Sequence, residues 1–88
     1  MPTIFMNAEL ETDYEAWAAN YDDHKSARVA AGIRDIYRGS VLDKPDNIRV
    51  VMWVPSMEVM ESFIDEHKDH IENSGHKLDT TEVTICSD

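Results

Sequence analysis

Apolar and polar residues alternate along the start of the chain, the period-two pattern of a strand with one buried face. From Asp13 the spacing changes to that of a helix, since Trp17 and Tyr21 recur one turn apart. The Asp13 carboxylate can accept hydrogen bonds from the first turn, and Gly32 tolerates the conformation that ends a helix. We therefore predict a strand over residues 3–10 and one helix from Asp13 to Gly32.

A hairpin follows this helix. Residues 34–41 predict a strand, and the segment 42–46, which contains Asp43 and Pro45, predicts the turn. The return strand over residues 47–54 has the strongest strand pattern in the chain, because it is rich in β-branched and apolar side chains. We expect this strand to lie in the centre of the sheet.

A second helix and a last strand complete the pattern. Ser56 is a suitable N-cap and Gly75 a suitable stop, so we predict a helix over residues 57–74. Val83 and Ile85 alternate with polar side chains, which predicts a strand over residues 80–86. The helix carries an apolar stripe formed by Met57, Met60, Ile64, His67 and Ile71.

The unit of strand, helix and strand thus occurs twice in 88 residues. Two such units form one antiparallel sheet of four strands in the order 4-1-3-2, with both helices on one face. The predicted class is α+β, in a single domain over residues 1–88, since a chain of this length supports one core. A domain of this size is marginally stable, so association with a second copy would help.

The two faces of the predicted sheet differ in character. The face with Ile4, Val50 and Met52 is the more apolar and takes the helices. Apolar side chains on the opposite face predict a homodimer, in which two sheets pack into a barrel, although tolerated surface residues are the alternative. The predicted dimer interface consists of Phe5, Asn7, Glu9, Arg49, Val51 and Trp53, with Glu9 opposite Arg49, Asn7 opposite Val51 and Phe5 opposite Trp53.

The chain is strongly acidic, with 18 acidic and 8 basic side chains and a net charge of −10. Phosphate backbones and anionic lipids would be repelled, so we expect neither a nucleic acid nor a membrane as a partner. No apolar run approaches the ~20 residues that span a bilayer, and the start of the chain lacks a signal-peptide pattern. We expect a cytoplasmic protein.

Two histidines are the candidate catalytic residues. His67 interrupts an apolar stripe, where burial would favour the neutral imidazole of a general base, and His24 lies near the edge of the first stripe. A structural histidine with one hydrogen bond explains the same positions. His67 and His70 have helical i, i+3 spacing, but without a matched third ligand they do not predict a metal site. His76, in a loop, is expected to be inert.

A ligand pocket is expected between the helices and the sheet. Arg28 has two interpretations: pointing inward it would hold a carboxylate or enolate, whereas snorkelling outward, which we favour, it covers apolar surface. No sequence motif for a metal or a cofactor is present, so none is predicted. The expected ligand-binding residues are Trp17, Tyr21, Arg28, Met52 and Met60.

In architecture the chain resembles the dimeric α/β-barrel superfamily, the ferredoxin-like group that includes antibiotic-biosynthesis monooxygenases, muconolactone isomerases and polyketide cyclases. Further short motifs are spread along nearly its whole length: Trp17, Tyr21-Asp22, Gly32-Ile33, Tyr37-Arg38-Gly39, the strand from Asp46 to Val54, and Ile71-Glu72-Asn73-Ser74-Gly75-His76. With these motifs the chain resembles a small bacterial family, frequent in cyanobacteria, that is described as a domain of unknown function. The superfamily implies a homodimer and a pocket where a small molecule reacts without a metal, but no catalytic residue carries over.

The favoured hypothesis is a cytoplasmic homodimer that binds a small apolar or aromatic metabolite between sheet and helices. On this hypothesis His67 and His24 supply acid–base chemistry without a cofactor, of the monooxygenase, isomerase or cyclase kind. The alternative is a noncatalytic module that recognises another protein or has a regulatory role, because no catalytic set accompanies the acidic surface. Whether the protein is an enzyme stays open on sequence grounds.

Overall fold

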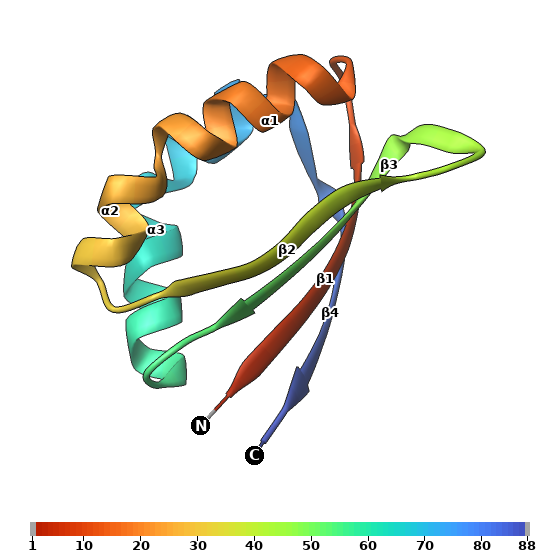
Figure 1. The fold of residues 1–88 in the computed structure, drawn as a ribbon. Helices are drawn as coiled ribbons and strands as arrows, with labels where there is room; N and C mark the ends of the chain where they lie inside the picture. Colours follow the sequence, from red (N-terminus) through yellow and green to blue (C-terminus); the bar gives the residue numbers. More distant parts are fainter. Residues whose placement is uncertain (1, 88) are drawn as a thin grey trace.

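The alternating strands form one four-stranded antiparallel sheet in the computed structural model, which describes residues 2–87. The strand order β2-β3-β1-β4 confirms the predicted order, and Figure 1 shows the helices on one side of the sheet. This is the predicted ferredoxin-like α+β arrangement. Its elements are β1 (Thr3–Leu10), α1 (Tyr14–Asp23), α2 (Lys25–Ala30), β2 (Arg34–Val41), β3 (Lys44–Trp53), α3 (Met57–Asn73) and β4 (His76–Cys86).

The core lies between the helices and one face of the sheet. β1 and β3 pair in antiparallel fashion, so every second residue of each strand faces the helices. In α3 Met57 and Met60 of the predicted stripe pack against the core, and Phe63, which the prediction omitted, is the buried residue of this helix. The buried apolar residues are Ile4, Ala8, Leu10, Trp17, Ala18, Ile33, Ile48, Val50, Met52, Val54 and Phe63.

Both predicted helices are interrupted at a histidine, which corrects the expectation of two continuous helices. His24, with φ −89° and ψ 5°, ends α1 and precedes α2, and Figure 1 shows that the two helices differ in direction. α3 is kinked at His67, where φ is −111° and ψ is 15°. Apolar spacing is insensitive to one non-helical residue, so the pattern could not locate either break. None of the helices in residues 2–87 has the length and apolar character that crossing a bilayer requires.

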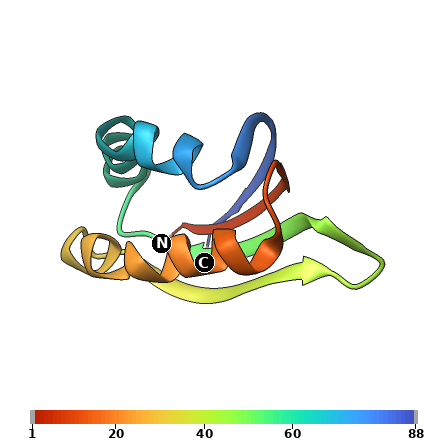
Figure 2. The same cartoon turned by 90° about the horizontal axis from the view of Figure 1, so that it is seen from above.

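Two strands begin earlier than predicted. β3 starts at Lys44 rather than at residue 47, and β4 starts at His76 rather than at residue 80. Proline has no N–H to donate to a neighbouring strand. Pro45 is tolerated in β3 because the β2–β3 hairpin extends beyond the rest of the sheet (Figure 2), where Pro45 is not paired with a residue of β1 or β2. The predicted five-residue turn is therefore a much tighter one at Leu42 and Asp43.

The register between β1 and β3 differs from the prediction by two residues. Asn7 pairs with Arg49, Phe5 with Val51, and Thr3 with Trp53, whereas Glu9 lies opposite Asn47. A shift of two keeps every side chain on its predicted face, because side chains alternate with that period. The assignment of faces is thus correct although the cross-strand partners are not.

Candidate functional site

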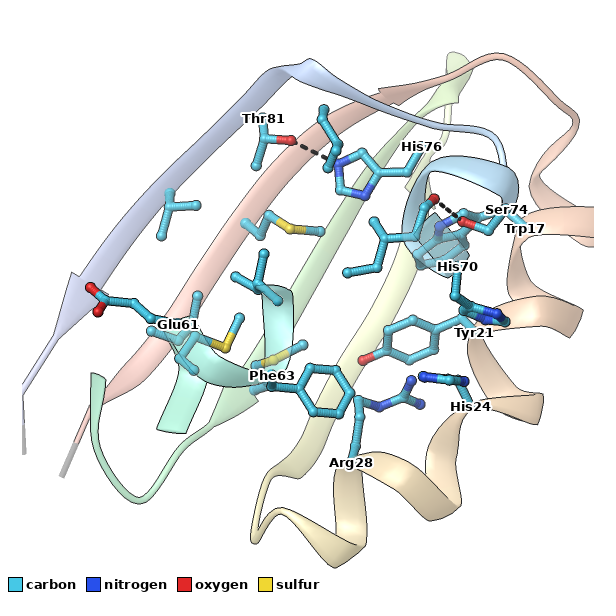
Figure 3. A pocket seen from close by; sticks show the side chains of 18 of the residues that line it. Trp17, Tyr21, His24, Arg28, Glu61, Phe63, His70, Ser74, His76 and Thr81 are labelled. Carbon is cyan, nitrogen blue, oxygen red and sulfur yellow. Dashed lines mark hydrogen bonds between the residues drawn. The ribbon is translucent and has the colours of Figure 1, made fainter. Parts of the chain in front are cut away.

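A cavity of about 370 Å³ lies between the helices and the sheet (Figure 3). Its wall combines side chains from β1, β3 and β4 with side chains from all three helices. The wall contains several methionine and aromatic side chains, and methionine adapts readily to differently shaped ligands. The lining residues are Ile4, Met6, Trp17, Tyr21, His24, Arg28, Met52, Met57, Met60, Glu61, Phe63, Ile64, His70, Ile71, Ser74, His76, Leu78, Thr81 and Val83.

All the residues predicted to bind a ligand line this cavity: Trp17, Tyr21, Arg28, Met52 and Met60. They come from α1, α2, β3 and α3, so the fold brings together positions that are far apart in the sequence. Trp17 and Tyr21 stack on one another, with ring centroids 5.0 Å apart, and form a continuous aromatic surface. That these residues contact a ligand stays a prediction.

Arg28 points inward, which corrects the favoured prediction that it covers the surface. Its side chain is 5% exposed, and its Nε and Nη2 atoms donate to the two carboxylate oxygens of Asp35 over 2.8 and 2.9 Å. The guanidinium also lies 3.7 Å from the centre of the Tyr21 ring, a cation–π contact. Sequence spacing could not reveal this because Asp35 lies on β2. The charge of Arg28 is thus already compensated, which argues against its capture of an anionic ligand.

The Tyr21 hydroxyl contacts the same carboxylate. It donates a hydrogen bond of 3.1 Å to Asp35 Oδ1. Burial holds the pKa of Tyr21 well above its usual value. The nearby Arg28 lowers this pKa and the Asp35 carboxylate raises it, but burial has the largest effect. The phenol therefore stays protonated at neutral pH and acts as a hydrogen-bond donor rather than as a base.

The two predicted catalytic histidines contact each other. His24 Nε2 and His67 Nδ1 are 2.9 Å apart, and the His24 ring stacks on that of His70 at a centroid distance of 3.9 Å. His24 and His70 line the cavity, whereas His67 lies outside its wall and packs on Phe63. We call His24, His67 and His70 the histidine cluster. His67 was expected to face the pocket from the apolar stripe, whereas in the structure its ring contacts His24 and does not line the cavity.

Within the histidine cluster, the surroundings of His24 favour its neutral imidazole. Desolvation, followed by the neighbouring His70, His67 and Arg28, holds the pKa of His24 below its usual value. His70 Nε2 is buried without a hydrogen-bond partner among the described residues. The rings of His24 and His70 are nearly parallel, at 17°, so their nitrogen lone pairs do not converge on one point. Within residues 2–87 no group of His, Cys, Asp and Glu side chains is arranged to hold a metal ion.

His76 was expected in an exposed loop, and this placement is wrong. It is 7% exposed, begins β4 opposite Leu10, and lines the cavity. Its Nε2 atom lies 2.7 Å from the hydroxyl of Thr81, and burial lowers the pKa of its imidazole. The alternation of His76 with Leu78 was a signal that the strand begins at this point, but Thr81 could not be paired with it from spacing alone.

The residues predicted to form a dimer interface all lie on the sheet face that the helices leave open. Phe5 is 44% exposed there, and Val51 and Trp53 are half-buried. Tyr37 of β2, opposite Val51, adds a further exposed aromatic ring that the prediction omitted. Interface formation stays a prediction for the whole set of Phe5, Asn7, Glu9, Arg49, Val51 and Trp53.

The family model described as a domain of unknown function, DUF3764, matches residues 1–88. This confirms the expected resemblance to a family of that description. None of the curated proteins matches the chain.

Solved structures with the same fold include two that carry the name "putative antibiotic biosynthesis monooxygenase". The protein from Bordetella bronchiseptica has a TM-score of 0.74 and 12% identity, over 99% of this chain and 95% of its own. The protein from Nitrosomonas europaea has a TM-score of 0.68 and 10% identity, over 100% and 98% of the two chains. At these identities the similarity shows a shared fold alone, and confirms the architectural resemblance drawn from the sequence.

Proposed function

The chain belongs to the DUF3764 family, and we propose that it is a cytoplasmic homodimer that binds a small apolar or aromatic molecule between its helices and its sheet. The observation that carries the proposal is the cavity of about 370 Å³ with its largely apolar wall. Pockets of roughly 300–1,000 Å³ with a few polar groups are typical of small-molecule sites. Two proteins with the same fold carry a name that refers to antibiotic biosynthesis, which is compatible with a small-molecule ligand.

The charges around the cavity favour a ligand without a net negative charge. Arg28, a cation on its wall, is neutralised by Asp35, and the whole chain has a net charge of −10. Both features disfavour the desolvation of an anion in the cavity. If an acid–base step accompanies binding, it falls to His24, because His24 lines the cavity and His67 does not.

A second copy of the chain would cover the open face of the sheet. Phe5, Tyr37, Val51 and Trp53 present apolar and aromatic surface there, which is unfavourable in water. A two-fold axis would place the same residues of both copies in contact, because such interfaces are self-complementary. The cavity lies on the other side of the sheet, so dimerisation and ligand binding are separately testable.

Binding of N-phenyl-1-naphthylamine, a neutral fluorophore that brightens in apolar surroundings, tests the cavity. We expect saturable binding by the natural protein and at least tenfold weaker binding by Met60→Trp, because the larger side chain fills the space. Leu42→Trp is the matched control: Leu42 is fully exposed in the β2–β3 turn, so an indole there leaves the cavity unchanged. Equal binding by all three proteins, or none by the natural one, would refute the proposal.

A further inference from the structure

The beginning of β4 departs from regular pairing with β1. Asn7 pairs with Glu82, but Glu9 pairs with Lys77, whereas regular pairing would bring Glu9 opposite Thr80. The Thr80 side chain compensates, because its hydroxyl accepts from the Glu9 N–H over 2.9 Å and donates to the Lys77 carbonyl over 2.7 Å. The irregularity is therefore a defined, hydrogen-bonded feature of the strand.

This irregularity brings His76 and Thr81 to the same side of the strand. The two residues are an odd number of positions apart, so in a regular strand their side chains would point to opposite faces. Instead both line the cavity, and His76 Nε2 meets Thr81 Oγ1 at 2.7 Å. Bulges re-aim side chains in this way and are common beside functional sites.

The remaining ring nitrogen of His76, Nδ1, is directed into the cavity in Figure 3. The buried polar residues of the described chain are Arg28, Ser74 and His76, and all of them line the cavity. Arg28 is bound to Asp35, and the Ser74 hydroxyl donates to the Ile71 carbonyl over 2.6 Å. A ligand therefore finds the hydrogen bonds of Arg28 and Ser74 already made, whereas His76 Nδ1 and His70 Nε2 have no partner among the described residues. Of these two histidines, His76 is the one whose other ring nitrogen is held by a side chain, the hydroxyl of Thr81.

We infer that His76, oriented by Thr81, is the hydrogen-bonding anchor of the cavity, and that the ligand is a neutral, largely apolar molecule with one hydroxyl or carbonyl oxygen. This inference rests on the proposed function. A threonine hydroxyl that donates to Nε2 leaves a proton on Nδ1, which suits a carbonyl, and one that accepts from Nε2 leaves Nδ1 an acceptor, which suits a hydroxyl. Both tautomers are uncharged, as the burial of His76 favours.

Three naphthalene derivatives of matched shape test the inference: naphthalene, 2-naphthol and 2-naphthoate. Calorimetric titration at pH 7.5 should give affinity for 2-naphthol roughly fivefold above that for naphthalene, the contribution of one hydrogen bond. The anionic 2-naphthoate should bind more weakly than either. In His76→Phe, 2-naphthol and naphthalene should bind equally, since the ring remains without its nitrogens.

Two further measurements keep the test decisive if His76→Phe fails to fold. Thr81→Val should reduce the preference for 2-naphthol, whereas Thr84→Val, a change on the open face of the same strand, should leave it unchanged. 2-Naphthol, but not naphthalene, should shift the ¹⁵N resonance of His76 Nδ1.

Equal affinity of the natural protein for 2-naphthol and naphthalene would overturn the role of His76 as anchor but not the proposal of an apolar ligand cavity. Tightest binding of 2-naphthoate overturns the neutral ligand class, and binding of none of the three overturns the proposed function and this inference with it.

Discussion

At the scale of single residues, two arginine–aspartate pairs differ in burial. Arg28 binds Asp35 with side-chain exposures of 5% and 23%, and Arg38 binds Asp22 with exposures of 32% and 55%. Removing one partner of a buried pair leaves an uncompensated charge, whereas exposed pairs contribute little because water screens them. The two pairs therefore provide a matched comparison.

Asp35→Asn is expected to lower the free energy of unfolding by about 3 kcal/mol, because the buried guanidinium of Arg28 loses its counter-charge. Asp22→Asn removes the same type of carboxylate at the surface and should cost less than about 0.5 kcal/mol. Urea denaturation followed by tryptophan fluorescence measures both. Similar losses in the two variants would show that Arg28 does not depend on Asp35 for its buried position.

At the scale of elements, the breaks in the helices coincide in space. His24 separates α1 from α2, His67 marks the kink of α3, and their rings meet at 2.9 Å. His70, one turn after the kink, stacks on His24. The histidine cluster thus connects the junction between α1 and α2 with α3.

Acidification should weaken this junction. The folded-state pKa of His24 lies below its unfolded value of 6.5, owing to desolvation and to His70, His67 and Arg28, so the unfolded chain binds the proton more readily. The contribution of neutral His24 to the stability of the folded protein is complete above about pH 6.5, and it is lost as the pH falls through the folded-state pKa of His24. NMR titration should place the pKa of His24 below 6.5, and His24→Gln should make stability between pH 7.5 and 5.5 less pH-dependent. A His24 pKa at or above 6.5 would contradict this.

At the scale of the whole molecule, the open sheet face determines the expected assembly. Light scattering should give twice the monomer mass at micromolar concentration. Phe5→Asp should shift the protein to a monomer, because it places a carboxylate in each half of a self-complementary interface. Leu42→Asp adds the same charge to the exposed hairpin turn and should leave the dimer intact. A natural protein that is monomeric at this concentration would refute the dimer.

Much of the cavity wall was predictable because local periodicity decides which side of a strand or helix a residue occupies. Trp17 and Met52 were placed correctly for this reason, and even a register wrong by two left Phe5 and Val51 on the correct face. His76 was missed because β4 is irregular near its start, and the prediction assumed the regular two-residue alternation of a strand. Phe63 was missed because the predicted stripe of α3 passed through its neighbour Ile64, whereas both residues line the cavity.

The sequence by itself determined the order of strands, the layer of helices and the two faces of the sheet, since alternation and capping are local properties that survive small errors in boundaries. Only the tertiary structure decided that Arg28 is neutralised by Asp35, that His24 meets His67, and that His76 with Thr81 faces the cavity. The first two contacts join different elements, and the third depends on an irregularity that pairing with β1 imposes on β4. Their geometry depends on packing that a one-dimensional pattern does not contain.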